Sequence, residues 1–253
     1  MRKLSALLIV KNERKHLPDV IDTLGFADEI IAVDSFSDDG TFEFLKDDPR
    51  VHCVQKQFVD YPSQRNYCME LAANDWVFFV DADERVPVKL AEEIQLLLKQ
   101  DSLANGYQIY RQFYYKREKL RFSGLQTDKA LRLFDRTKGQ YRAEKLVHET
   151  LDLSQPVGIL KNKLDHYFFD DYQTYRSKMI TYGKMKGLEL YQRGKKYQSA
   201  KQFFKTIYKF LNHYLIRLGI LDGAKGFIVA KLNARSVWER YKELKRLSLS
   251  PKE

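Results

Sequence analysis

The chain has 253 residues, a formal net charge of +10 and 44% hydrophobic residues. That hydrophobic content is enough for a large core, so wholesale disorder is excluded. The two cysteines, Cys53 and Cys68, are too few for a disulfide scaffold or a cysteine-rich metal site. No uncharged apolar run reaches the about 18 residues of a membrane span. Residues 1–14 make a poor signal peptide, because their apolar run is short and no cleavage site follows it. These features predict a cytoplasmic location.

Basic residues are concentrated in the last third of the chain. Residues 1–171 contain 25 Lys and Arg against 29 Asp and Glu, a net charge of −4. Residues 172–253 contain 19 against 5, a net charge of +14. An acidic-to-neutral body with a strongly basic end predicts an anionic partner, either a membrane surface or a nucleic acid. The alternative is a helical face whose charges are simply solvated.

The first 100 residues alternate between apolar runs and helical patterns. The runs are apolar on both faces, as buried parallel strands are, and they predict strands at 4–10, 29–33, 51–55 and 76–80. Apolar residues at helical spacing predict helices at 14–25, 40–47, 62–73 and 87–100. This order predicts an α/β fold with a parallel sheet, in which ligands bind beyond the carboxyl ends of the strands.

The pattern changes after residue 104. Strand-like segments separated by polar loops are predicted at 106–115, 129–135 and 145–151. Helices are predicted over 171–193 and 199–247, with a break marked by the glycines between 219 and 226. We therefore expect an α/β domain over residues 1–170, divided near residue 100, and a helical, basic region over 171–253.

Acidic side chains follow three of the predicted strands: Glu13, Asp34 and the run from Asp81 to Glu84. The glycine-rich phosphate loops of many nucleotide-binding proteins are missing. A diphosphate can instead be held through Mg²⁺ or Mn²⁺, which bind carboxylates and complete their shells with substrate phosphates. Asp81 and Asp83 form a D-x-D pattern that could supply this bridge. The alternative is a turn in which an Asp caps the helix that begins near Pro87.

Three segments resemble the family-two inverting glycosyltransferases, and more narrowly the bacterial lipopolysaccharide-core glucosyltransferase group. They are SALLIVKNERKHL, DEIIAVDSFSDDGT and SQRNYCMELAANDWVFFVDADERV. The resemblance covers residues 4–245 and is most specific from Gln64 to Glu84. Where the family often has two acids after the second strand, this chain has only Asp34, as the lipopolysaccharide-core members do. The resemblance implies a GT-A fold with a Rossmann-like nucleotide-binding sheet, a UDP-sugar donor and a divalent metal.

The resemblance also implies roles for residues around the donor. Asp34 would hydrogen-bond the uracil ring, and Lys11 and Glu13 would line the nucleoside pocket. Arg65 would lie close to the donor, with a surface position on a helix as the alternative.

Three further residues are implied at the metal. Asp81 would lie near the ribose and the metal, and Asp83 would ligate the metal. His166 matches a late histidine that many GT-A enzymes give to the metal, and neutral imidazole suits Mn²⁺ better than Mg²⁺. A purely structural His166 is the alternative.

An inverting transfer needs a base that takes the proton of the acceptor hydroxyl. Glu149, which matches a His-Glu motif of the resembled group, is the first candidate. Asp128 is the second and Glu144 the third. The alternative for Glu149 is an exposed acid on a strand.

Residues 201–221 carry a cation every four residues, at Lys201, Lys205, Lys209, His213 and Arg217, and a wide apolar face opposite them. A basic amphipathic helix of this kind is typical of a membrane interface, and its interior cations argue against spanning. The alternative is a helix packed on the catalytic domain with a basic outer face.

Together these features predict a metal-dependent inverting glycosyltransferase that moves a hexose, with glucose favoured, from a UDP-sugar. The acceptor would be a lipopolysaccharide-core or other cell-surface glycan, lipid-linked, at the inner face of a bacterial cytoplasmic membrane, with no nucleic-acid partner. One alternative is a nucleotidyltransferase, which would carry a Gly-rich loop where KNERKH stands. The other is a nucleic-acid-binding protein without activity, which leaves the strand-end acids unexplained.

Overall fold

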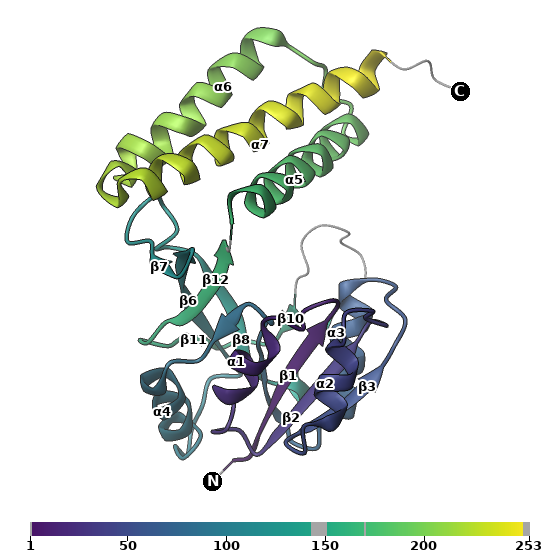
Figure 1. Ribbon diagram of the computed structural model, residues 1–253. Helices are drawn as coiled ribbons and strands as arrows, with labels where there is room; N and C mark the ends of the chain where they lie inside the picture. Colours follow the sequence, from purple (N-terminus) through teal and green to yellow (C-terminus); the bar gives the residue numbers. More distant parts are fainter. Residues whose placement is uncertain (1, 143–150, 170, 250–253) are drawn as a thin grey trace. The chain divides into compact units, whose positions relative to one another are not determined.

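The computed structural model describes residues 2–142, 151–169 and 171–249 (Figure 1). The chain folds into two compact units. The first comprises Met1–Arg111 and Lys129–His166, and the second comprises Gln112–Asp128 and Tyr167–Glu253. The functional division at residues 100 and 170 stays a prediction.

Four parallel strands form the centre of the first unit, in the order β3-β2-β1-β4. They are β1 (Leu4–Val10), β2 (Glu29–Asp34), β3 (Val51–Gln55) and β4 (Trp76–Phe79). The intervening helices are α1 (Leu17–Asp22), α2 (Thr41–Asp47) and α3 (Tyr61–Leu71). This alternation confirms the α/β prediction. Helix α1 is shorter than predicted because it begins only at Leu17, with Pro18 in its first turn.

Beyond β4 the sheet becomes mixed. Strand β8 (Lys129–Asp135) runs antiparallel to β4, and β6 (Gly106–Tyr115) runs antiparallel to β8. The sheet continues through β12 (Leu164–Phe169) to β5 (Glu84–Arg85), which precedes α4 (Val88–Leu97). The remaining strands are short: β7 (Glu118–Lys119) and β11 (Val157–Ile159) pair with β6, and β9 (Gly139–Tyr141) pairs with β10 (Leu151–Leu153). Most of the strand predicted at 145–151 lies outside the described residues.

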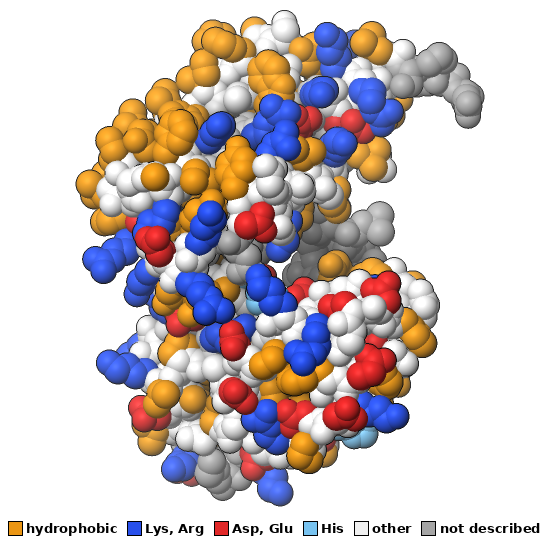
Figure 2. Space-filling model, in the orientation of Figure 1, with side chains coloured by type: hydrophobic (Ala, Val, Ile, Leu, Met, Phe, Trp, Pro, Cys, Tyr) orange, Lys and Arg blue, Asp and Glu red, His pale blue; other side chains and the backbone are white. Residues whose placement is uncertain are grey.

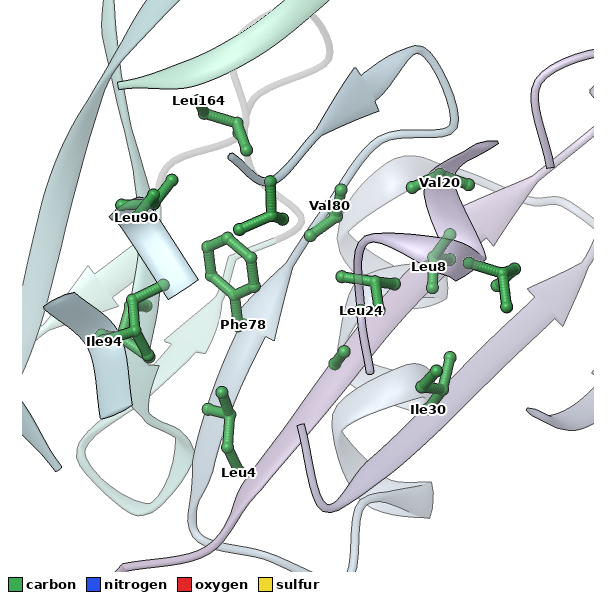
Figure 3. Packing of buried hydrophobic residues seen from close by; sticks show 14 of the residues in the cluster. Leu4, Leu8, Val20, Leu24, Ile30, Phe78, Val80, Leu90, Ile94 and Leu164 are labelled. Atoms are coloured by element: carbon green, nitrogen blue, oxygen red, sulfur yellow. The ribbon is translucent and has the colours of Figure 1, made fainter. Parts of the chain in front are cut away.

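The core of the first unit lies on both faces of the sheet. Because successive strand residues point to opposite faces, Leu8 and Phe78 pack in one cluster while Leu7 and Phe79 pack in the other. Figure 3 shows side chains from the strands and helices meeting in the first cluster, with Phe78 among them. Apolar side chains fill both faces, so polar side chains collect at the strand ends.

The second unit is mainly helical. Its elements are α5 (Tyr172–Gln192), α6 (Ser199–Leu211), the π-turn η2 (Asn212–Ile216), the 3-10 turn η3 (Gly219–Asp222) and α7 (Ala224–Leu249). Both predicted helical regions and the predicted break are confirmed. Helices α5 and α7 approach closely: a Cβ at Gly183 would lie 2.5 Å from the Ser236 carbonyl oxygen, and one at Gly187 would lie 2.6 Å from that of Arg240. No helix in the described part of the chain is both long and apolar enough to cross a membrane.

Candidate active site

The loops that follow β1 and β2 are hydrogen-bonded to each other. The Asn12 N–H donates to Ser37 Oγ (2.8 Å), and Lys11 Nζ donates to a backbone carbonyl of the β2 loop. The Glu13 N–H donates to the hydroxyl of Thr41 at the start of α2 (2.9 Å). The structure therefore brings Lys11 and Glu13 to the edge of the sheet where β2 ends.

Asp34 is the last residue of β2 and is fully buried. Its carboxylate accepts hydrogen bonds from the Ser37 N–H (3.0 Å), from the Ser37 hydroxyl and from Gln55 Nε2 (3.0 Å). Asp34 thus holds the β2 loop in place.

The D-x-D pattern lies in a tight turn between β4 and β5. The Glu84 N–H donates to the Asp81 carbonyl (2.9 Å), and the Asp81 N–H donates to Glu84 Oε2 (3.0 Å). Pro87 occupies the N-cap position of α4, without a side-chain capping bond. The alternative in which an Asp of this turn caps the helix is therefore wrong.

A buried arginine contacts two carboxylates of this turn. Arg132 lies on β8, which pairs with β4 so that Leu133 faces Phe78. Arg132, which precedes Leu133, therefore lies beyond Phe78 and reaches the turn that follows β4. The Arg132 guanidinium, only 4% exposed, contacts the Asp81 carboxylate and lies 2.6 Å from Glu84 Oε1.

Burial and charge push the two carboxyl pKa values apart. Partial burial would raise the pKa of Asp81, whose side chain is 43% exposed, but the charges of Arg132 and Arg65 outweigh this effect and hold the pKa well below its usual value. Burial raises the pKa of Glu84 despite the neighbouring Arg132. Burial would lower the pKa of Arg132, but Asp81 and Glu84 keep it above its usual value. Asp81 and Arg132 therefore remain charged.

Arg65 of α3 is partly buried, and its role near the donor stays a prediction. Its side chain is 15% exposed, with the guanidinium 3.8 Å from Asp81 Oδ1. The guanidinium carbon lies 4.9 Å from the ring centroid of Phe79 and 5.4 Å from that of Tyr141. The two aromatic rings hold a permanent positive charge beside the D-x-D turn.

Asp83 and His166 face each other. Asp83 Oδ1 lies 3.3 Å from His166 Nε2, and the side chains are 21% and 6% exposed. The antiparallel pairing of β5 with β12 places Glu84 opposite His166, so the preceding residue comes next to the imidazole. The sheet thus joins two predicted metal ligands that are far apart in sequence.

The separation of this pair is compatible with two ligands of a divalent cation. Two ligands about 2.1 Å from an octahedral ion and at right angles lie about 3.0 Å apart, which is close to the observed separation. Across residues 2–142, 151–169 and 171–249 there is no group of three or more His, Cys, Asp or Glu placed to hold a metal. A cation here would need substrate phosphates or water to complete its shell, as Mg²⁺ commonly does. Asp81 is occupied by Arg132, and its predicted contact with the metal stays a prediction.

The described residues do not test the candidate bases. Glu149 and Glu144 lie outside the described residues. Asp128 belongs to the second unit, where its N–H donates to the Leu125 carbonyl (3.3 Å). The assignment of the base stays a prediction.

Sequence reasoning missed Arg132 and gave Glu84 no role of its own. Arg132 stands between Leu131 and Leu133 in a predicted strand. A cation in an apolar strand must be paired if it is buried, and that was the available signal. Glu84 had no comparable signal, because the burial of its carboxylate depends on strands distant in sequence.

The sequence model of glycosyl transferase family 2 matches residues 5–154, more than half of the chain. The chain belongs to this family. An uncharacterised glycosyltransferase of Rickettsia typhi is 25% identical, over 98% of this chain and 89% of its own length. The lipopolysaccharide core biosynthesis glycosyltransferase LpsC of Rhizobium meliloti is 27% identical, over 94% of this chain and 93% of its own length. The predicted glycosyltransferase activity is confirmed.

Solved structures of other proteins resemble this chain in fold. TarS 1-349 of S. aureus in complex with UDP-GlcNAc has a TM-score of 0.52 and 12% identity, covering 97% of this chain and 92% of that chain. TarS 1-349 without that ligand has a TM-score of 0.50 and covers 99% of this chain. These likenesses confirm the GT-A fold.

Proposed function

We propose that this glycosyltransferase moves a hexose, with glucose favoured, from a UDP-sugar to a lipopolysaccharide-core or other cell-surface glycan. The observation that carries the proposal is the pairing of Asp83 with His166 at the strand-end edge of a family 2 sheet. The name of LpsC supports this acceptor class, and the UDP-GlcNAc bound to TarS supports a UDP-sugar donor.

The nucleoside would bind at the ends of β1 and β2. Asp34, at the end of β2, would hydrogen-bond the uracil ring, and Lys11 and Glu13 would line the pocket. Asp81, oriented by Arg132, would lie near the ribose. This arrangement needs no glycine-rich phosphate loop.

Asp83 and His166 would hold Mg²⁺ or Mn²⁺ against the diphosphate. The ion, when bound, stabilises the charge that develops on the leaving group. Arg65, whose guanidinium lies over the rings of Phe79 and Tyr141, would add a positive charge to the same side of the site.

The transfer would be a single inverting displacement. The acceptor hydroxyl oxygen attacks the anomeric carbon, and the bond from that carbon to the diphosphate oxygen breaks on the opposite side. The hydroxyl proton passes to a carboxylate as the new bond forms. We propose Glu149 as this base, with Asp128 and then Glu144 as the alternatives.

The acceptor would be lipid-linked, and the enzyme would work on the cytoplasmic side, attached peripherally to the inner face of the membrane. The net charge of +14 over residues 172–253 supports an anionic surface as a partner. Nucleic acid has no place in this proposal.

The test is an assay of UDP release with UDP-glucose, UDP-galactose and UDP-N-acetylglucosamine on truncated lipopolysaccharide cores. We expect turnover that requires Mg²⁺ or Mn²⁺, is fastest with UDP-glucose and inverts the anomeric configuration of the product. Full turnover in the presence of EDTA would contradict the metal. Binding of duplex DNA at moderate salt without binding of any UDP-sugar would contradict the proposal as a whole.

A further inference from the structure

Helix α6 packs its polar side inward. Gln202 is buried, and its Nε2 donates to the Trp238 carbonyl of α7 (3.2 Å). His213, just beyond the helix, is also buried, with Nδ1 2.7 Å from the Ser123 carbonyl oxygen. Lys209 is half-buried on the same side of the helix. The predicted cations therefore do not share one exposed face: Lys201 and Lys205 are exposed, whereas Lys209 and His213 are partly or fully buried.

The apolar side of α6 faces solvent. An amphipathic helix of a globular protein normally buries this side, so the packing is reversed. Phe204 is 68% exposed, Ile216 of η2 is 66% exposed and Leu221 of η3 is 62% exposed. We call this exposed surface the apolar face; its residues are Phe203, Phe204, Ile207, Tyr208, Leu211, Leu215, Ile216, Leu218, Ile220 and Leu221. Figure 2 shows hydrophobic side chains gathered over α6. The predicted alternative of a packed helix with a basic outer face does not describe this surface.

The charged side chains within the segment that forms the apolar face have one sign. Residues 199–221 contain no Asp or Glu. Lys201 and Lys205 are exposed on α6, at helical positions beside the apolar face. Asp222, the first acid after this segment, is buried and accepts hydrogen bonds from the backbone N–H groups of Arg121 and Phe122 (2.9 Å each). A partner that covers the apolar face therefore meets cations at its margin.

A second copy of the chain suits this surface poorly. In a two-fold dimer the same patch lies on both sides of the interface, so cations would meet cations. An anionic lipid surface supplies both an apolar layer and negative charges at its boundary. Helices of this type lie in the plane of the bilayer surface, which agrees with the lack of a membrane-spanning helix among the described residues.

We propose that the apolar face of α6, η2 and η3 inserts into the surface layer of an anionic bilayer, with Lys201 and Lys205 at the level of the lipid phosphates. The inference deepens the proposed peripheral attachment by naming the surface responsible. It changes the role expected of the cations. Insertion of aromatic and aliphatic side chains binds the protein to the bilayer, and the lysines add an electrostatic contribution to the binding free energy that salt screens.

The test is co-sedimentation of the full chain with vesicles of phosphatidylglycerol and phosphatidylethanolamine. We expect the wild type to bind, and a double variant Phe204→Glu with Ile216→Glu to lose affinity by at least on the order of tenfold. Leu96→Glu on α4, at a position 63% exposed in the first unit, is the matched control and should bind as the wild type does. Lys201→Gln with Lys205→Gln should bind more weakly at low salt than the wild type and similarly at high salt.

A second measurement does not depend on sedimentation. Phe204→Trp places an indole on the apolar face, and its emission should shift to shorter wavelength when these vesicles are added, beyond any shift of the wild type. Equal thermal unfolding of all variants shows that they are folded. Vesicle binding by the double glutamate variant equal to that of the wild type would overturn the proposal. So would a wild-type dimer that the glutamates dissociate while vesicles bind neither form.

The assay of UDP release keeps this inference separate from the proposed function. If the wild type binds vesicles but turns over no UDP-sugar, the proposed function fails and the insertion stands. If it turns over UDP-sugar with a soluble acceptor and ignores vesicles, the insertion fails and the function stands.

Discussion

His166 Nε2 lies 3.3 Å from Asp83 Oδ1, and a ladder of two residue pairs sets that separation. Glu84 faces His166 and Arg85 faces Asp165 across β5 and β12. The imidazole and the carboxylate are thus positioned by paired strands rather than by a loop alone. In the proposed function, this preorganised pair would receive a cation together with the diphosphate.

Asp83→Asn should nearly abolish transfer while leaving the fold intact. The change removes the charge from the proposed cation site but keeps the size of a partly exposed side chain. We expect kcat to fall by at least on the order of 10²-fold, as when one preorganised electrostatic contact is lost. Asp75→Asn, at a side chain 70% exposed, is the matched control and should keep wild-type turnover. Near wild-type turnover of Asp83→Asn at saturating Mn²⁺ would refute the metal assignment.

Glu149→Gln should block transfer without weakening donor binding. Gln keeps the shape of the side chain but cannot accept the proton of the acceptor hydroxyl. Isothermal titration should give the same UDP-sugar affinity for the variant and the wild type, while product formation is lost. If Glu149→Gln is active and Asp128→Asn is not, Asp128 is the base.

Arg132→Met should destabilise the first unit. The substitution removes the buried cation that contacts Asp81 and Glu84, while Arg65 and Arg111 remain 3.8 Å and 3.7 Å from these two carboxylates. Removal of one partner from a fully buried ion pair costs about 3–5 kcal/mol. Because Asp81 is 43% exposed and the other two arginines compensate part of the charge, we expect a loss near the lower end of that range. Urea denaturation should show this loss in the free energy of unfolding.

Arg136→Met is the matched control for that experiment. Arg136 is paired with the exposed Asp75 at 4.0 Å, and its Nε donates to the Asn74 carbonyl (2.9 Å). An exposed pair and a hydrogen bond each contribute about 1 kcal/mol. Equal losses in the two variants would show that the buried network around Arg132 contributes no more than a surface pair does.

The strands and the acids at their ends could be predicted from the sequence, because both depend on local patterns. The apolar runs specify β1 to β4, and parallel strands place Asp34 and Asp81 at one edge of the sheet. The prediction that Asp83 and His166 serve the same metal came from the family resemblance rather than from any local pattern. Their contact depends on the pairing of β5, which has only two residues, with a strand about eighty residues away in sequence.

The orientation of α6 could not be read from its sequence either. The helical period identifies an apolar face and a basic face but does not say which of them packs. Gln202 is hydrogen-bonded to a backbone carbonyl of α7, and His213 lies within hydrogen-bond distance of a carbonyl in segment 112–128. These contacts orient the polar side of the helix inward. Such partners become visible only once the second unit is assembled.

The stability of the second unit should depend on pH through His213. Burial, together with the charges of Lys209 and Arg217, lowers the pKa of His213 to about 4, although its bond to the Ser123 carbonyl opposes this. In the unfolded chain the pKa is about 6.5, so the unfolded state binds more protons between pH 6.5 and 4. The contribution of the neutral imidazole is therefore complete above pH 6.5 and is lost as the pH falls towards 4.

His213→Gln should remove this part of the pH dependence. Gln does not titrate, and its amide can still donate to the Ser123 carbonyl. We expect the wild type to lose roughly 2 kcal/mol more unfolding free energy than the variant between pH 7 and pH 4, after allowance for solvent screening. His52→Gln, at an exposed position on β3, should follow the wild type. Urea denaturation at a series of pH values measures the difference, and parallel curves for the wild type and His213→Gln would show that His213 is not held neutral by the fold.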